Sequence, residues 1–506
     1  MLRFHRKIKE TKERIYIMKL SVLLNGFEYE CVQGNVDVSI GALVYDSRKV
    51  KKGDVFVALC GAAFDGHSFA AEVQLKGAAA IVAEKDITGA LCGKEITVIK
   101  THSTRRALAF MSAAYFGRPA ERLITIGITG TKGKTTTAYM VKSVLERIGI
   151  RTGLIGTIET IIGDEHIKAV NTTPESYIVQ ETFAKMADAG LKCVVMEVSS
   201  QGLMLERVGG FVFDYGIFTN LSQDHIGPNE HKDFDEYLRC KAKLFKQCSR
   251  GIVNADDPYV SQIIEGASCE IETFGIDSQA DLKAENLSLL SKPGVLGIRY
   301  ALKGRGETDV EVDIPGRFSV YNSLTAIALC LHFTDDLQLI CSALKEVQVK
   351  GRVEIVPVSD KYTVIVDYAH NAVSLESLLA SLREYGPKRL IVLFGCGGER
   401  SRARRFEMGE AASRLADFTI VTSDNPRREK PEDIIADIIT GIKRAGGEYT
   451  VIPDRRKAIF YALENALEGD VIVLAGKGHE DYQDAGGVKT HFSDAETVLE
   501  YKLLNT

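Results

Sequence analysis

The segment GTKGKTTT, residues 130–137, constrains the fold more than any other part of the sequence. It follows RLITIGIT, an apolar run typical of a buried strand, and precedes the amphipathic segment TTTAYMVKSVLERIG. One helical face of that segment carries Ala138, Val141, Val144, Leu145 and Ile148. The order strand, glycine-rich loop, helix predicts a loop whose backbone N–H groups and helix N-terminus bind phosphates.

The side chains of this loop suit a nucleoside triphosphate and a metal ion. Lys134 can reach the β- and γ-phosphates, and the Thr135 hydroxyl can bind Mg²⁺. We expect the remaining ATP contacts in the loop from Gly130, Thr131, Lys132, Gly133 and Thr136. Ile128 stands where the common G-x4-GK-[ST] motif has its first glycine, which argues against an ordinary P-loop motor. A glycine-lysine turn without a ligand is the alternative, and the flanking strand and helix disfavour it.

Two further residues are candidates for the metal site. Transfer of a γ-phosphoryl group develops charge that Mg²⁺ must neutralise, so acidic and imidazole ligands are expected nearby. Glu197 ends the strand-like run VVMEV, and His225 follows another such run in NLSQDH. His225 could hold a second Mg²⁺; a hydrogen-bonded structural histidine is the alternative.

The pattern of apolar runs predicts an α/β protein with three domains, as the length of 506 residues also suggests. We place an N-terminal domain at 1–118, a central ATP-binding domain at 119–348 with a β-rich stretch from 270 to 315, and a C-terminal domain at 349–506. In the last region strands and helices alternate, which predicts a Rossmann-like, doubly wound, mostly parallel sheet.

Polar clusters follow the strands of this C-terminal region. They are Asp367 to His370, Glu399-Arg400, Asp424 to Arg427, Asp454-Arg455 and Gly476 to Glu480. Ligands of open α/β sheets bind at the carboxyl ends of the strands. Polar loop residues alone would explain one or two such clusters but not five.

Composition excludes several classes of protein. Lys and Arg number 63 and Asp and Glu 68, a net charge of −5, so a nucleic-acid partner is not expected. The longest uncharged stretch, Phe318 to Thr334, is shorter than the ~18 apolar residues that span a bilayer and contains polar residues, so no membrane insertion is expected.

The ten cysteines include no C-x-x-C pair, which fits buried thiols in a reducing compartment. Residues 1–17 lack the apolar centre of a secretory signal and are interpreted as a disordered arm or a start-site artefact before Met18. We therefore expect a cytoplasmic protein, and a monomer.

Several motifs together resemble the Mur ligase family over nearly the whole chain from about residue 40. Besides GTKGKTTT, they are DSRKVKKGDVFVALCG, NTTPE (171–175), EVSS (197–200), TNLSQDH (219–225), NADDP (254–258), YNSLTAIA (321–328), GRVE (351–354) and DYAH (367–370). The resemblance implies a UDP-sugar domain, an ATPase domain and an amino-acid domain. It also implies Mg²⁺ and an ATP-dependent ligation through an acyl phosphate, in which a UDP-N-acetylmuramoyl-L-alanyl-D-glutamate carboxylate is joined to an amino acid.

The segment DNPR, Asp424 to Arg427, marks the members that add meso-diaminopimelate rather than L-lysine. Diaminopimelate is lysine with an additional far carboxylate, which the guanidinium of Arg427 can hold with two hydrogen bonds. The resemblance completes this pocket with Arg400, Asn425, Pro426, Gly476 and Glu480, with Glu480 suited to the distal ammonium group. A solvated surface arginine is the alternative for Arg427 alone.

The resemblance assigns further roles residue by residue. Lys241 in YLRCKAKLF matches the lysine that CO₂ carbamylates beside the second Mg²⁺. Lys243 is the alternative if the register differs. A lysine that is simply solvated is the alternative without a functional role. Asn322 and Arg352 are expected at the nucleotide, and Asp367 in the same neighbourhood. The UDP-muramoyl dipeptide contacts carried over are Tyr45, Ser47, Asn171, Thr172, Thr173, Ser199 and Arg207.

Three positions depart from the family pattern: Gln201, Leu205 and the Asn-Ala that follows DYAH. A sibling ligase that adds L-lysine or D-alanyl-D-alanine is the nearest rival. A regulatory protein that kept the loop but lost activity, and a nucleic-acid ATPase, are the others.

Overall fold

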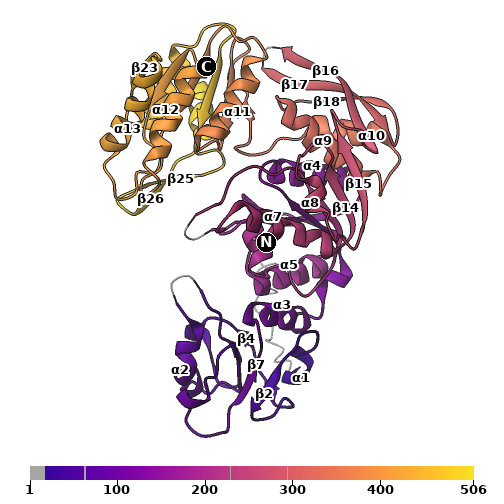
Figure 1. Ribbon diagram of the computed structural model, residues 1–506. Helices are drawn as coiled ribbons and strands as arrows, with labels where there is room; N and C mark the ends of the chain where they lie inside the picture. Colours follow the sequence, from indigo (N-terminus) through magenta and orange to yellow (C-terminus); the bar gives the residue numbers. More distant parts are fainter. Residues whose placement is uncertain (1–17, 62–63, 228–229, 293, 506) are drawn as a thin grey trace, which may run out of the picture.

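The computed structural model describes residues 18–61, 64–227, 230–292 and 294–505. Figure 1 shows three α/β units that follow one another along the chain, each with its own sheet. The α/β class is confirmed. The boundaries predicted after 118 and 348 fall between strands of different sheets. The arm predicted at 1–17 lies outside the described residues.

The first unit contains a five-stranded sheet. Its strand order is β2 (Glu30–Gln33), β7 (Thr97–Lys100), β6 (Ala80–Ala83), β5 (Val55–Val57), β4 (Leu43–Val44). A small ladder joins β1 (Met18–Lys19) to β3 (Ser39–Ile40). The helices are α1 (Leu20–Leu23), α2 (Ala70–Leu75) and α3 (Thr104–Tyr115), with short 3₁₀ turns at Ser47–Lys49, Gly66–Phe69 and Thr88–Ala90. The Ser103 side chain caps α3 by accepting a hydrogen bond from the Arg106 N–H.

The middle unit contains an eleven-stranded sheet. Its order is β11 (Glu165–Lys168), β10 (Glu159–Ile162), β9 (Thr152–Ile155), β12 (Cys193–Glu197), β8 (Ile124–Thr129), β13 (Phe213–Phe218), β14 (Cys248–Asn254), β15 (Glu270–Gly275), β16 (Leu282–Lys292), β17 (Val295–Gly304), β18 (Thr308–Val312). In this sheet order, the consecutive strands from β9 to β16 run parallel to one another. Antiparallel strands extend the sheet at both ends. The β-rich stretch predicted from 270 to 315 contains β15 and β16, which end the parallel part, and β17 and β18, which form the antiparallel extension at that end.

Helices cover both faces of the parallel part, which explains why its strands are apolar throughout. One face packs against α4 (Lys134–Arg147) and α9 (Arg317–Cys330), with α10 (Leu337–Lys345) beside them. The other face packs against α5 (Ser176–Asp188) and α7 (Phe234–Ala242). The remaining short helices are α6 (Ser200–Met204), α8 (Val260–Ile263) and 3₁₀ turns at Pro119–Arg122 and Lys243–Lys246.

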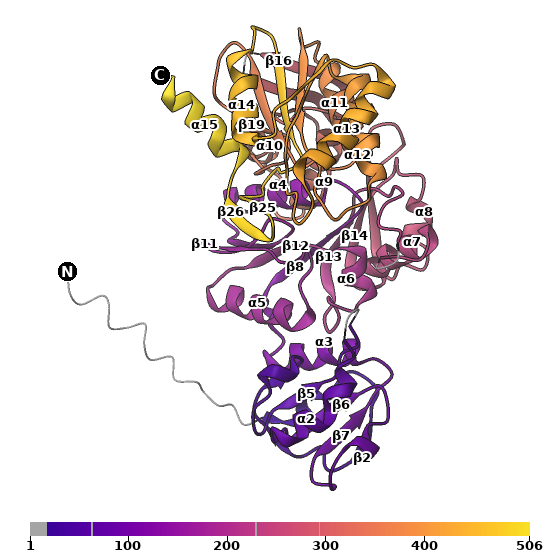
Figure 2. The same ribbon diagram turned by 90° about the vertical axis from the view of Figure 1, so that its left-hand side faces the viewer.

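The C-terminal unit is doubly wound, as predicted. Its sheet has the order β19 (Glu354–Val356), β20 (Thr363–Asp367), β24 (Val471–Ala475), β21 (Leu390–Phe394), β22 (Phe418–Val421), β23 (Tyr449–Val451), and only β19 is antiparallel. One face carries α11 (Ala372–Arg383), α12 (Ala403–Leu415) and α13 (Pro431–Ala445); the other carries α14 (Arg455–Glu464) and α15 (Asp494–Leu504). A hairpin of β25 (Tyr482–Ala485) and β26 (Val488–His491) leaves this unit toward the middle one (Figure 2).

Among the described residues, no helix has the length and apolar character needed to cross a membrane. All ten cysteines are free thiols, but Cys31, Cys60 and Cys92 are exposed. The expectation of buried thiols is therefore wrong for these three, because Cys31 lies on the exposed edge strand β2 of the small first sheet and Cys60 and Cys92 lie in loops of the same unit.

Candidate active site

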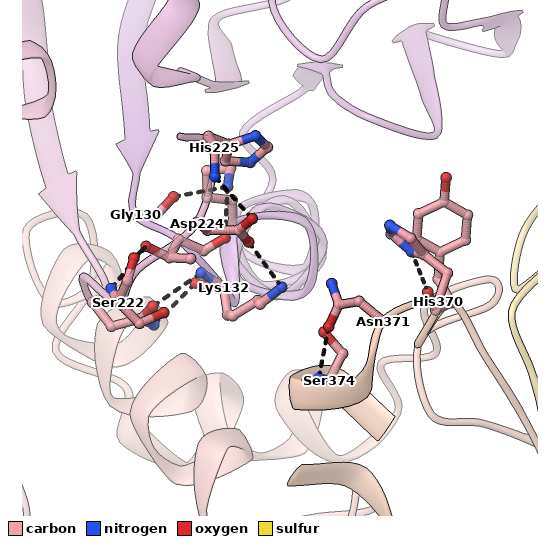
Figure 3. A network of polar contacts seen from close by, with 12 residues as sticks. Gly130, Lys132, Ser222, Asp224, His225, His370, Asn371 and Ser374 are labelled. Carbon is pink, nitrogen blue, oxygen red and sulfur yellow. Dashed lines mark hydrogen bonds and ion pairs between the residues drawn. The ribbon is translucent and has the colours of Figure 1, made fainter. Parts of the chain in front are cut away.

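A cavity of about 750 Å³ lies between the middle and C-terminal units. Its walls come from the carboxyl ends of β8, β12 and β13 on one side and of β20, β21, β22 and β24 on the other. Figure 3 shows Lys132, Asp224 and His225 of the middle unit on one side of this space and His370 and Asn371 on the other. Both predicted ligand-binding edges therefore face one shared cavity.

The glycine-rich loop adopts the predicted geometry between β8 and α4. Gly130 has φ +151° and packs so closely that an added Cβ would lie 1.9 Å from the Thr219 hydroxyl oxygen. The Lys134 Nζ donates to the Gly130 and Thr131 carbonyls at 2.8 and 3.1 Å. Burial lowers the pKa of the Lys134 ammonium to about 8. A phosphate could replace these two carbonyls as acceptor for the cation.

Glu197 is buried at the end of β12 and faces the loop. One carboxylate oxygen accepts hydrogen bonds from the Thr135 and Thr157 hydroxyls at 3.0 and 2.9 Å, and the other accepts from the Thr157 N–H at 2.8 Å. It forms no ion pair with any residue that the structure describes. A buried carboxylate next to a hydroxyl, with no cation of its own, is a hard oxygen donor set of the kind that Mg²⁺ accepts.

Lys241 is fully buried on α7, so the solvated interpretation is wrong for it. Its Nζ donates to the Gly130 carbonyl at 2.8 Å and lies 4.4 Å from the centre of the Tyr237 ring. Burial, followed by repulsion from Lys134, moves the pKa of Lys241 well below its ordinary value. Lys243, the alternative in register, is exposed, and its Nζ lies 3.5 Å from the Leu203 carbonyl outside the cavity.

His225 lines the cavity from a loop and is half exposed. Its φ is +56°, and its Nδ1 lies 3.1 Å from a carboxylate oxygen of Glu230. The neighbouring Asp224 pairs with Lys132 at 3.3 Å. No group of three or more metal-ligating side chains forms among the described residues, so the second metal site is not preassembled by His225.

Five of the seven residues expected at the muramoyl dipeptide line the cavity together: Asn171, Thr172, Thr173, Ser199 and Arg207. The Thr173 hydroxyl donates to the Glu197 carbonyl at 2.9 Å and accepts from the Ser199 N–H at 2.9 Å. The Arg207 guanidinium donates to the Thr173 carbonyl at 3.0 Å. The group is thus fixed to the strand that carries Glu197.

The other two lie outside this cavity, in the first unit. Tyr45 is half-buried and packs against Tyr177 of α5, with 5.7 Å between the ring centres. Ser47 opens a 3₁₀ turn, where its carbonyl accepts from Lys76. A substrate that touched these two and the cavity would have to span the junction between the first two units.

On the opposite wall, Asp424 to Arg427 follow β22. Arg427 has φ +53°, its side chain donates to the Gly398 carbonyl, and its backbone N–H donates to the Asp484 carbonyl of the hairpin. Arg400 and Glu480 line the same end of the cavity. Gly476 leaves room for Asp424, since an added Cβ would lie 2.8 Å from its carboxylate. Pro426 is buried in the turn and points no side chain into the cavity.

The comparisons with known proteins agree with this arrangement. Three family models match: the Mur ligase family catalytic domain at 39–116, the Mur ligase middle domain at 128–330, and the Mur ligase glutamate ligase domain at 351–478. A Clostridium perfringens protein named UDP-N-acetylmuramoyl-L-alanyl-D-glutamate–2,6-diaminopimelate ligase is 41% identical over 96% of this chain and 99% of its own. A Clostridium botulinum protein of the same name is 43% identical with the same coverage.

The chain belongs to the Mur ligase family. A solved structure, also of a UDP-N-acetylmuramoyl-L-alanyl-D-glutamate–2,6-diaminopimelate ligase, shares 28% identity and a TM-score of 0.71 over 97% of this chain and 99% of its own. A MurF ligase from Thermotoga maritima in complex with ADP, 18% identical with a TM-score of 0.56 over 91% of this chain and 96% of its own, shares the fold.

In this Mur ligase, the three residues expected at or near the nucleotide occupy different places relative to the cavity. Arg352 lines the cavity and stacks over the Tyr368 ring at 4.7 Å. Asn322 lies behind the loop instead, where it accepts from the Thr137 hydroxyl at 3.2 Å and touches Gly133. Asp367 is buried at the end of β20 and accepts hydrogen bonds from the Val353 and Ala369 N–H groups.

Sequence reasoning missed several residues of the Mur ligase cavity. Thr157 holds Glu197, yet no motif marked it. Lys477 lies within the polar cluster Gly476 to Glu480, directly behind the cavity wall, and no role was predicted for it, although it is fully buried among charged neighbours. Tyr482 enters from the hairpin, whose approach to the cavity depends on tertiary structure. The position of Lys477 between two glycines, directly after the buried strand-like run VIVLA, is the signal that could have found it.

Proposed function

We propose that this protein is the ATP-dependent ligase that adds meso-diaminopimelate to UDP-N-acetylmuramoyl-L-alanyl-D-glutamate in peptidoglycan precursor synthesis. The observation that carries the proposal is that the phosphate loop and the Asp424–Arg427 segment, far apart in sequence, line one cavity. The names of relatives that match almost the full chain support the choice of substrates.

The first step activates an inert carboxylate. The D-glutamate γ-carboxylate attacks the γ-phosphorus of ATP, which gives an acyl phosphate and ADP. Lys134 and the loop N–H groups balance the charge that develops on the phosphates. Mg²⁺, held by Thr135 and Glu197, would supply further neutralisation of that charge. His225 and a carbamylated Lys241 are proposed to hold a second Mg²⁺.

The second step forms the peptide bond. The amine of diaminopimelate attacks the acyl carbon, phosphate leaves, and the amine releases a proton. Asn171, Thr172, Thr173, Ser199 and Arg207, with Tyr45 and Ser47 from the first unit, are proposed to hold the dipeptide substrate. Arg427 and Arg400 suit the far carboxylate, while Asp424, Asn425 and Glu480 suit the far ammonium group. No side-chain nucleophile is required.

Phosphate release from the purified protein tests the proposal. With ATP, Mg²⁺ and UDP-N-acetylmuramoyl-L-alanyl-D-glutamate, we expect release with meso-diaminopimelate and little with L-lysine. Turnover with lysine but not diaminopimelate would reject the assignment of Arg427. Release that is equally fast without the muramoyl substrate, or that appears only with D-alanyl-D-alanine and a muramoyl tripeptide, would reject the reaction.

We further propose that the protein acts in the cytoplasm as a monomer, on small molecules and without nucleic acid. The near-balanced charge supports the part of this proposal that excludes nucleic acid. Light scattering at working concentration should give a mass near 55.5 kDa, and a mass twice as large would contradict the monomer.

A further inference from the structure

Lys477 is a buried lysine directly behind the cavity wall formed by Asp424, Asn425 and Glu480, and no role has been assigned to it. It follows Gly476 after the end of β24, and its side chain has no solvent exposure. Its Nζ lies 3.2 Å from Asn425 Oδ1, 3.7 Å from a Glu480 carboxylate oxygen and 3.9 Å from an Asp424 carboxylate oxygen. A buried ammonium is costly unless it is paired, so this placement needs an explanation.

The neighbouring Asn425 amide is held in one orientation by three contacts. Its Oδ1 accepts from Lys477 and from the Asp484 N–H at 3.0 Å, and its Nδ2 donates to Glu480 at 2.8 Å. Because donors face one side of the amide and an acceptor faces the other, only one of its two flipped orientations makes all three hydrogen bonds. Lys477 and Asn425 together therefore fix where the Glu480 carboxylate points.

The charges in this corner do not cancel. Asp424 and Glu480 carry two negative charges and Lys477 one positive charge, which leaves one negative charge beside the cavity. The buried pair of Arg455 and Asp494 beneath it is neutral by itself. The other charged or titratable groups that act on Glu480 or its neighbours are Arg427, Arg352, Asp484, Tyr368 and Tyr482. The positive charge of Arg427 is assigned by the proposed function to the far carboxylate of the substrate. The missing positive charge matches the ammonium of a diamino acid.

We propose that Lys477 is a positioning residue that keeps the Glu480 carboxylate oriented and charged beside Asp424, and so makes the pocket specific for a substrate whose far end carries an ammonium group. The inference rests on the proposed function, because it names what holds the amino-acid site of that reaction. Lys477 acts through Glu480 and Asn425 and touches no reacting atom.

The electrostatics give the proposal a direction. Burial and the nearby Asp424 raise the pKa of Glu480, while Lys477 lowers it. Without the lysine, the pKa of Glu480 rises further, so the protonated carboxyl is more populated at any given pH than in the wild type. A neutral carboxyl binds an ammonium weakly, and raising the pH removes the proton again. The defect caused by losing Lys477 should therefore shrink as pH rises.

The first test compares Lys477→Met with Lys489→Met. Lys489 is an exposed lysine that lies 4.3 Å from the Tyr482 ring centre and makes none of the contacts to Asn425 or Glu480. For Lys477→Met we expect the KM for diaminopimelate at pH 7 to rise at least about tenfold, as for the loss of a hydrogen bond to a charged group. The KM values for ATP and the dipeptide substrate should stay within about twofold.

The same variant should recover part of its affinity between pH 7 and 8.5, whereas Lys489→Met should match the wild type throughout. An unchanged KM for diaminopimelate in folded Lys477→Met would overturn the proposal. So would a rise that is equal for all three substrates, or one that pH leaves untouched, because a merely structural lysine would give those results.

The second test uses the wild-type protein and holds even where Lys477→Met does not fold. Diaminopimelate is titrated calorimetrically, at pH 7.5 and in two buffers of different ionisation enthalpy, into enzyme saturated with a non-hydrolysable ATP analogue and the dipeptide substrate. If Glu480 is already ionised, binding releases fewer than about half a proton per site. Release of about half a proton or more overturns the inference. A wild-type protein that neither binds nor consumes diaminopimelate contradicts the proposed function instead.

Discussion

The two walls of the cavity are built in different ways. The middle-unit wall centres on one continuous strand, loop and helix, and its key groups are tied to the loop itself: Lys134 and Lys241 both donate to the Gly130 carbonyl. The C-terminal wall is assembled from the ends of four strands and a hairpin, and Arg427 is held there with a left-handed backbone. A local motif thus makes the phosphate site, and tertiary structure makes the amino-acid site.

This difference has a functional meaning. Every member of a family that uses ATP needs the same phosphate geometry, and a rigid local motif supplies it. Choice of amino acid needs a pocket whose parts can change separately, and loops at strand ends supply that. Damage to the first wall should therefore affect kcat, and damage to the second should affect the KM of one substrate.

The largest effect is expected for Lys134→Ala. Loss of the cation at the phosphates should lower kcat for phosphate release about a thousandfold or more, since a single such group contributes up to this factor. Lys142→Ala is the matched control, because Lys142 lies on the same helix, pairs with Glu146 and does not line the cavity. If Lys134→Ala changed only the KM for diaminopimelate, the division of labour between the walls would be wrong.

Lys241→Ala should lower kcat about a hundredfold. The pKa of Lys241 lies well below its ordinary value, so the neutral amine, which is the form that reacts with CO₂, is more populated than in an ordinary lysine and increases as pH rises. Removal of CO₂ and bicarbonate should slow the wild type, and added bicarbonate should restore it. Lys243→Ala should behave as wild type; a wild type indifferent to CO₂ would refute the carbamate.

Arg427→Ala should raise the KM for diaminopimelate at least about 30-fold, because truncating one partner of a buried charged pair costs ~2 kcal/mol or more. The KM for ATP should stay unchanged. The neighbouring Arg428 is exposed, so Arg428→Ala is the matched control. Equal kinetics for Arg427→Ala and Arg428→Ala would show that the far carboxylate binds elsewhere.

The smallest effect is expected where the walls touch. Lys168 of β11 pairs with Asp481 and lies 4.9 Å from the Tyr482 ring centre, so it links the middle unit to the hairpin that holds Arg427. Exposed ion pairs contribute little, so Lys168→Met should raise the KM for diaminopimelate by less than about fivefold. Lys489→Met, which touches the same ring from within the hairpin, should give no change. A large effect on kcat would mean that the walls are mechanically coupled.

The sequence predicted the parts that depend on local pattern. The loop between β8 and α4, the parallel strands and the doubly wound C-terminal sheet follow from hydrophobic period and glycine spacing. The position of Glu197 near the loop could be predicted for the same reason, since it ends an apolar strand that pairs with β8.

Other features could not be predicted, because they depend on contacts between distant segments. Asn322 lies behind the loop because α9 packs on α4, and no pattern in YNSLTAIA gives that distance. The burial of Lys241 could not be predicted from its K-x-K run either, because the pattern does not say that Lys241 points inward and Lys243 outward. Lys477 is buried because Asp424 and Asn425, which follow the end of β22, pack against it.

The buried pair of Arg455 and Asp494 has a consequence for biosynthesis. Arg455 also donates to the Ala475 carbonyl, next to Gly476, while Asp494 opens the helix α15. During translation the phosphate loop can fold long before this helix leaves the ribosome, whereas the corner around Gly476 gains its support only afterwards. A nascent chain would therefore be able to bind a nucleotide well before it could select an amino acid.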